Sequence, residues 1–158
     1  MIKFIPEITR IATMVIFPSC SIKKLEWIYK NFPPDWLINW QKGPTGHAAY
    51  VGFNTWEPLL VYGKLKSIYL HDTIKFNSNE KMGNYNHPCP KPIKYFQHFY
   101  TKCLPNGGKV IDPFLGSGTA RIAADICKID FVGYELDKDY YLAQEKRFND
   151  FKQQLKLF

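Results

Sequence analysis

Apolar positions along the chain switch between strand-like runs and helical spacing, which is typical of layered α/β proteins. The β-branched run Thr13–Pro18 predicts a strand that ends at a proline. Apolar residues then recur at helical spacing and predict a helix over Ile22–Phe32, with Ser21 as its N-cap. Two further strands, Asp35–Gln41 and Pro58–Tyr62, are expected to pair antiparallel to each other.

Two segments lack a strong pattern. Lys42–Thr55 is rich in glycine, proline and threonine, and we predict a loop there. Residues 65–86 are polar and weakly periodic, so they are predicted to be irregular. Regular periodicity resumes in the last part of the chain. It predicts helix, strand, helix, strand and helix over Pro92–Leu104, Lys109–Pro113, Ala120–Cys127, Asp130–Tyr134 and Lys138–Leu155, the last of them capped by Asp137.

Length and composition place the chain among globular proteins. It has 158 residues, of which 46% are hydrophobic and 22% charged, so it suits one packed domain and excludes disorder, collagen and coiled coil. The four cysteines form no C-x-x-C pair, which favours neither a disulfide scaffold nor a metal site and fits reduced thiols in a cytoplasm. No apolar run approaches the roughly 20 residues of a membrane helix.

The chain carries a net charge of +7. The excess is concentrated between Trp36 and Lys102, where eight lysines stand against three acidic residues. A local positive excess suits a nucleic acid backbone, although an ordinary solvated surface has a similar composition. The candidates for contact with DNA are the loop residues Lys42, Gly43, Thr45, Gly46 and His47.

A strand, a glycine turn and a helix follow one another over Lys109–Cys127. Gly116 and Gly118 let the backbone bend tightly and approach a ligand, while the N–H groups at the helix start attract an anionic group. Glu135 ends the next strand, 19 residues after Gly116. An acidic side chain at this place is positioned to accept both hydroxyls of a ribose.

The nucleoside ligand is expected to be S-adenosylmethionine rather than a dinucleotide. A dinucleotide site prefers a third glycine, but that position holds Arg121, whose bulk opposes close packing of helix on strand. S-adenosylmethionine combines a ribose with an amino acid and has no pyrophosphate. A purely structural glycine turn is the alternative, and the neighbouring Asp112, Pro113 and Phe114 make the ligand site the better interpretation.

These residues resemble those of the DNA methyltransferases that modify an exocyclic amine, N6 of adenine or N4 of cytosine, in the permuted class whose cofactor module follows the catalytic half. The resemblance lies in His87–Pro92 before a helix, in Val110–Thr119 and in Gly133–Glu135. The stretch Lys42–Lys64 is similar to the region that those enzymes place before target recognition. The fold implied is a partial Rossmann-like α/β sheet with helices on both faces.

The resemblance also implies how the chain is divided. A single domain over 1–158 would hold a strand and helix half at 1–64, a target-facing segment at 65–86 and a cofactor-binding module at 87–158. The implied cofactor-binding residues are His87, Lys91, Pro92, Asp112, Pro113, Phe114, Gly116, Ser117, Gly118, Thr119, Glu135 and Leu136. The first three would lie beside the methionine end of S-adenosylmethionine. Asp112 and Phe114 would contact its methionine or adenine portion, and Glu135 would hold the ribose.

One departure from the family is important. Its catalytic tetrapeptide, an acid, Asn or Ser followed by two prolines and an aromatic residue, is absent from the sequence. The sole Pro-Pro pair, Pro33–Pro34, follows Phe32 and precedes Asp35, and it is interpreted as a helix end. By resemblance, the tetrapeptide ends a central strand between those of Thr13 and Lys109. We therefore expect a chain that begins downstream of this strand, with weak stability and no methyl transfer of its own.

Several alternatives stay open at this point. The missing strand could come from a second polypeptide, the flanking strands could pair directly, or the chain could be a truncated gene product. The leading function is the cofactor-binding part of a restriction-modification DNA methyltransferase in a prokaryotic or phage cytoplasm. A non-catalytic subunit or remnant that binds cofactor or DNA is the second, and a methyltransferase acting on RNA, protein or a small molecule is the third. Neither a metal nor a membrane is expected.

Overall fold

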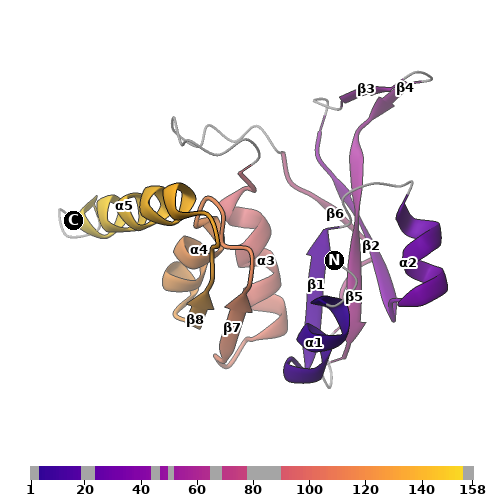
Figure 1. Cartoon of the computed structure of the whole chain (residues 1–158), viewed down its shortest axis with the longest axis horizontal. Coiled ribbons are helices and arrows are strands. Elements are labelled where there is room, and N and C mark those ends of the chain that lie inside the picture. The colour runs from indigo at the N-terminus through magenta and orange to yellow at the C-terminus, as the bar shows by residue number, and fades with distance from the viewer. Residues whose placement is uncertain are drawn as a thin grey trace. The chain divides into compact units, whose positions relative to one another are not determined.

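The computed structural model describes residues 4–18, 24–43, 47–49, 52–64, 69–77 and 90–154 (Figure 1). The chain forms two compact units, residues 1–77 and 78–158. The first unit contains α1 (Phe4–Ile11), β1 (Met14–Pro18), α2 (Leu25–Asn31), β2 (Trp36–Gln41), β3 (His47–Ala49), β4 (Gly52–Asn54), β5 (Trp56–Gly63) and β6 (Thr73–Lys75). The second contains α3 (Ile93–Cys103), β7 (Lys109–Asp112), α4 (Thr119–Cys127), β8 (Asp130–Gly133) and α5 (Lys138–Gln154).

The first unit is built on a four-stranded sheet in the order β1-β5-β2-β6. The strand β5 runs antiparallel to both neighbours, so that Leu60 lies opposite Phe17 on one side and Leu37 on the other. Its residues from Pro58 to Tyr62 are all buried, which explains their continuous apolar run. The predicted strands and the antiparallel pairing of β2 with β5 are confirmed.

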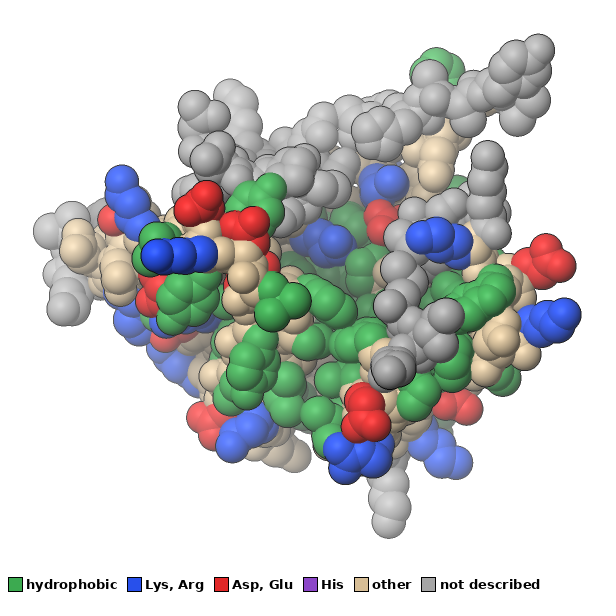
Figure 2. Space-filling view, viewed as in Figure 1, with side chains coloured by type: hydrophobic (Ala, Val, Ile, Leu, Met, Phe, Trp, Pro, Cys, Tyr) green, Lys and Arg blue, Asp and Glu red, His purple; other side chains and the backbone are tan. Residues whose placement is uncertain are grey.

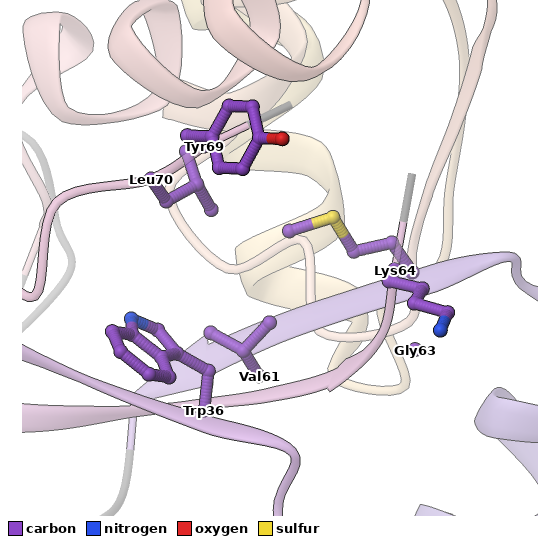
Figure 3. A pocket seen from close by; sticks show the side chains of 7 residues that line it. Trp36, Val61, Gly63, Lys64, Tyr69 and Leu70 are labelled. Carbon is purple, nitrogen blue, oxygen red and sulfur yellow. The ribbon is translucent and has the colours of Figure 1, made fainter. Parts of the chain in front are cut away.

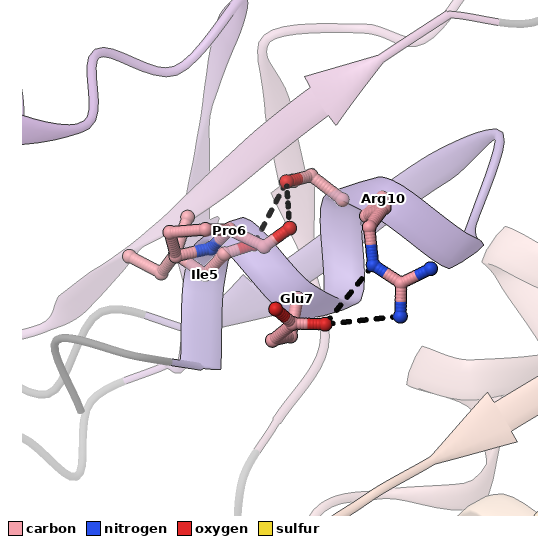
Figure 4. Close-up of polar contacts among 5 residues, drawn as sticks. Ile5, Pro6, Glu7 and Arg10 are labelled. Atoms are coloured by element: carbon pink, nitrogen blue, oxygen red, sulfur yellow. Dashed lines mark hydrogen bonds and ion pairs between the residues drawn. The ribbon is translucent and has the colours of Figure 1, made fainter.

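Helices α1 and α2 share a core with this sheet. Ile5 and Ile8 of α1 and Ile28 of α2 are buried together with Val15, Leu60 and Tyr62 of the strands. The helix α1 was not predicted from the sequence. Its own polar contacts are local (Figure 4): the Thr9 hydroxyl donates to the Ile5 carbonyl at 2.8 Å, and exposed Arg10 pairs with Glu7 at 3.0 Å. Such contacts contribute little, so burial of the two isoleucines accounts for the helix.

Three other predictions for this unit need correction. The segment Lys42–Thr55 is not only a loop, because β3 and β4 pair as an antiparallel hairpin inside it. The segment 65–86 contains the short strand β6, which pairs parallel to β2 with Asn39 opposite Thr73. The predicted N-cap Ser21 lies outside the described residues, and Lys24 caps α2 without a side-chain hydrogen bond.

The second unit confirms the predicted order of elements. The parallel strands β7 and β8 pair with Val110 opposite Phe131, and α3 packs against α4. Its core contains Tyr100, Ala123, Ala124 and Ile129, with Val110 and Phe131 packed against them. Asp137 caps α5 as predicted, since its carboxylate accepts the N–H groups of Asp139 and Tyr140 at 2.9 and 3.0 Å.

Each unit has an open strand edge. Among the described residues, β1 has β5 as its strand partner and β7 has β8, so one side of each strand lacks a neighbour. The expectation that a central strand belongs between β1 and β7 stays a prediction. No described helix is both long and apolar enough to cross a membrane.

Candidate functional site

The glycine turn lies between the end of β7 and the start of α4. The Asp112 carboxylate accepts the N–H of Phe114 at 2.9 Å, which starts the turn, and the N–H of Gly118 donates to the Leu115 carbonyl at 2.9 Å. Gly116 and Gly118 have φ angles of 49° and 72°. These left-handed conformations are costly for any residue with a Cβ, so the glycines are required by the turn itself.

Glu135 ties this turn to the end of β8. One oxygen of its carboxylate, Oε2, accepts the N–H of Gly116 at 2.8 Å, and the other, Oε1, accepts the N–H of Asp137 at 3.0 Å. Each carboxylate oxygen has further lone-pair sites, so both can still accept a hydroxyl. The side chain is therefore held in place and can bind a vicinal diol.

Asp112 lies beside the turn with an unusual electrostatic environment. Burial raises the pKa of its carboxyl group above the ordinary value, and the charge of Glu135 adds to the increase. The hydrogen bond from Phe114 and the positive charge of Lys91 act in the opposite direction. A carboxyl group whose pKa is shifted by burial and by neighbouring charges is typical of functional sites.

Exposed apolar side chains flank these carboxylates. Phe114 is 67% exposed and Leu136 fully exposed, and Tyr134 is also exposed. Figure 2 shows acidic and hydrophobic side chains gathered where α5 begins. The site thus joins two fixed carboxylates with solvent-facing apolar groups, a combination that can hold a polar ribose and cover a flat ring.

The structure brings most of the predicted cofactor residues together in the second unit. The turn residues from Asp112 to Thr119, with Glu135 and Leu136, surround the ends of β7 and β8. Pro92 is buried and precedes α3, and Lys91 acts electrostatically on Asp112. His87 lies outside the described residues.

The predicted DNA-contact residues belong to the first unit. The ammonium group of Lys42 lies 3.8 Å from Glu57 Oε2, so part of its charge is already engaged. Gly43 has a φ of 87°, and a Cβ there would lie 2.7 Å from Asn77 Oδ1. Thr45 and Gly46 lie outside the described residues, and only the backbone of His47, in β3, is described.

The Pro-Pro pair has a structural role. Phe32 ends α2, and its carbonyl oxygen accepts the Tyr62 hydroxyl at 2.8 Å. After the prolines, the Asp35 N–H donates to the Val61 carbonyl, and the Asp35 carboxylate accepts the Gly63 N–H at 2.7 Å. These contacts explain the pair as a link from α2 into β2.

Among the described residues, no group of three or more metal-ligating side chains comes together. Cys103 and Cys127 are free thiols, and burial raises the pKa of Cys103 to about 11, which leaves it protonated near neutral pH.

A separate pocket opens in the first unit (Figure 3). Its volume is about 230 Å³, and Trp36 and Val61 lie across it from Tyr69 and Leu70. Met14, Gly63 and Lys64 complete the lining, which contains no carboxylate that could accept ribose hydroxyls. The pocket includes none of the predicted site residues, so the glycine turn remains the candidate site.

Sequence reasoning missed two residues of α5 that contact the turn. Arg147 and Gln144 are buried, and Arg147 donates hydrogen bonds to Ser117 and Thr119. Both lie in α5, for which the sequence predicted a helix and no site residue. The contacts join residues 28 to 30 positions apart, and no local pattern indicates them.

Comparison with known proteins gives a family match. Residues 53–146, more than half of the chain, match the family model described as DNA methylase. The Escherichia coli (strain K12) protein YubD, which is named as a methylase, is 31% identical over 106 residues, 65% of this chain and 45% of its own length. The Type II methyltransferase M2.MboI of Moraxella bovis is 23% identical over 136 residues, 81% of this chain and 48% of its own length. The chain thus spans less than half the length of these relatives.

Solved structures share the fold. The M1.HpyAVI–SAM complex has a TM-score of 0.65 at 24% identity and matches 86% of this chain and 74% of that chain. The PvuII DNA methyltransferase, described as cytosine-N4-specific, has a TM-score of 0.64 at 16% identity over 85% of this chain and 62% of its own. At these identities the likeness concerns the fold, and it confirms the α/β class expected from the sequence.

Proposed function

Because the chain belongs to the DNA methylase family, we propose that it binds S-adenosylmethionine at the glycine turn between β7 and α4. The family uses this compound as its methyl donor. In our proposal, Glu135 accepts the two ribose hydroxyls, and Asp112 and Lys91 lie toward the charged amino-acid end. Phe114 and Leu136 cover the adenine ring.

The observation that carries the proposal is the double hydrogen bond of Glu135. Its carboxylate accepts backbone N–H groups from both sides, Gly116 at 2.8 Å and Asp137 at 3.0 Å, and so is fixed before any ligand binds. A fixed acceptor loses little conformational entropy when it binds, which favours recognition of a diol. A merely structural turn does not need a partly exposed acidic side chain at this position.

The acceptor substrate in the proposal is DNA. The amine nitrogen of adenine N6 or cytosine N4 attacks the methyl carbon, the carbon–sulfur bond breaks with its electron pair going to sulfur, and the nitrogen loses a proton to solvent. Members of the family hold the flipped base with an acid-Pro-Pro-aromatic segment, which this sequence does not contain. We therefore propose that the chain alone binds cofactor without transferring methyl groups, and that a second polypeptide supplies the catalytic segment. A cytoplasmic prokaryotic or phage setting, as part of restriction-modification, fits this role.

Calorimetric titration with S-adenosylhomocysteine tests the binding site. The native chain should release heat, and Glu135→Gln should lower the affinity at least about tenfold, because it removes the charge from hydrogen bonds worth roughly 1.5–3 kcal/mol. Asp130→Asn is the matched control: it changes the same charge at the other, exposed end of β8 and should bind like the native chain. No heat from the folded native chain would exclude the proposal.

Transfer of a labelled methyl group to DNA tests the proposal that the chain needs a second polypeptide for catalysis. The purified chain should bind cofactor and leave DNA unlabelled, and labelling should appear when a polypeptide carrying the acid-Pro-Pro-aromatic segment is added. Rapid labelling of DNA by the chain alone would contradict the proposed inactivity. Labelling of RNA but not of DNA would show that RNA, and not DNA, is the methyl acceptor.

A further inference from the structure

A buried arginine connects α5 to the glycine turn. Arg147 is only 6% exposed, and its Nη1 donates to the Ser117 carbonyl oxygen at 2.7 Å and to the Thr119 hydroxyl at 2.9 Å. The Thr119 hydroxyl in turn lies 3.0 Å from the Ser117 hydroxyl. One guanidinium group therefore contacts the two residues on either side of Gly118.

These contacts fix one peptide plane of the turn from both sides. The plane between Ser117 and Gly118 carries the carbonyl that accepts from Arg147 and the N–H that donates to the Leu115 carbonyl at 2.9 Å. A planar peptide held at its oxygen and at its nitrogen cannot rotate without breaking both hydrogen bonds. Breaking them would leave a buried charge without these acceptors, which is costly.

The packing of α5 on the turn is equally close. A Cβ on Gly118 would lie 2.9 Å from Gln144 Cβ, and Gln144 itself is 2% exposed. The helix α5 thus packs directly on the turn at Gly118. At the other end of the turn, the N–H of Gly116 donates to Glu135.

We propose that Arg147 is a positioning residue for the cofactor: it holds the peptide at 117–118 so that the turn keeps its ligand-accepting shape. This inference rests on the proposed function of the turn. Arg147 itself does not contact the ligand. Its role is to keep the left-handed Gly118 and the first N–H groups of α4 in one arrangement, which removes an ordering cost from binding.

The competing explanation is that Arg147 only docks α5 on α4. A second ion pair between the helices allows the two explanations to be distinguished. Lys152 of α5 donates to the Asp125 carboxylate of α4 at 2.8 Å and does not contact the turn. Arg147→Met and Lys152→Met both remove a cation that joins the helices. Only Arg147→Met removes the hydrogen bond to the Ser117 carbonyl oxygen.

The test combines calorimetry with S-adenosylhomocysteine and amide hydrogen exchange, both below the unfolding temperature of every variant. Arg147→Met should lower affinity about tenfold and speed exchange at residues 116–119 in the free protein, whereas Lys152→Met should change affinity less than about twofold. Thr119→Val, which keeps the buried volume, should weaken binding in the same direction, and its effect should not add to that of Arg147→Met.

Equal losses in Arg147→Met and Lys152→Met, or native affinity in Arg147→Met, would overturn the proposal. If Arg147→Met does not fold, Thr119→Val decides, because native affinity and native exchange at the turn would then count against it. A native chain that binds no cofactor contradicts the proposed function alone. In that case the exchange rates at 116–119 still report whether Arg147 holds the turn.

Discussion

At the scale of single residues, Glu135 does two things at once. It satisfies the N–H groups of Gly116 and Asp137, and it keeps lone pairs for a ligand. A glutamine at this position would turn one acceptor into a donor that faces a backbone N–H. The loss of affinity in Glu135→Gln will therefore include some loosening of the turn, and the unfolding temperature of that variant must be measured beside it.

Asp112 leads to a prediction about pH. Its pKa is higher in the folded than in the unfolded chain, so the folded state binds the proton more tightly and the ionised carboxylate destabilises the fold. Without cofactor, Asp112→Asn should raise the unfolding temperature at pH 7, by roughly 2–4 °C for each kcal/mol gained. The advantage should shrink as the pH falls and disappear below about 4, the ordinary carboxyl pKa.

Thermal unfolding from pH 3 to 8 checks this, with Asp130→Asn at the exposed start of β8 as the control that should not change. The asparagine can still accept the Phe114 N–H, so that hydrogen bond is kept in the comparison. A lower unfolding temperature for Asp112→Asn at pH 7 would mean that attraction to Lys91 outweighs burial, contrary to the direction inferred here.

At the scale of elements, the sequence predicted what is locally specified. The glycine turn, Glu135 and the cap at Asp137 could be placed because spacing and residue type determine them. The strand β6 could not, since its three residues become a strand only by pairing with β2, more than 30 positions away. The helix α1 was missed for a similar reason: burial of Ile5 and Ile8 stabilises it, and its short sequence shows no capping signal.

The close approach of β5 to the start of β1 leads to a prediction about stability. Gly63 has a φ of 74°, and a Cβ there would lie 2.2 Å from the Thr13 carbonyl oxygen. Gly107 has a φ of 84° with open space around it. Both alanine substitutions carry the backbone strain of roughly 1–2 kcal/mol, but Gly63→Ala adds a clash with backbone that cannot move aside.

We therefore expect Gly63→Ala to destabilise the chain by about 3 kcal/mol or more, and Gly107→Ala by about 1 kcal/mol. Urea unfolding followed by circular dichroism measures both. Equal losses would show that the strand ends separate easily and that the close approach of β1 to β5 is not required by the fold.

At the scale of the whole molecule, the described cofactor candidates are confined to one unit, whereas the basic residues are spread over both. All described cofactor candidates lie in the second unit, whereas the eight lysines of residues 36–102 are divided equally between the two units. S-adenosylmethionine itself carries a net positive charge, so the net charge of +7 does not favour its binding and needs another explanation. Attraction to the DNA backbone provides one, because it depends on charge and not on the glycine turn.

Because one kind of binding depends on charge and the other on the glycine turn, DNA binding and cofactor binding should fail independently. Fluorescence anisotropy with a labelled duplex should show affinity falling at least about tenfold between 50 and 200 mM salt, as expected when two or more phosphates are neutralised. Replacing exposed Lys64 and Lys75 by glutamine should lower both the affinity and the salt slope, whereas Lys138→Gln on α5 should change neither. Affinity that does not depend on salt, or equal effects of all three lysines, would mean that the local excess between residues 36 and 102 is an ordinary solvated surface.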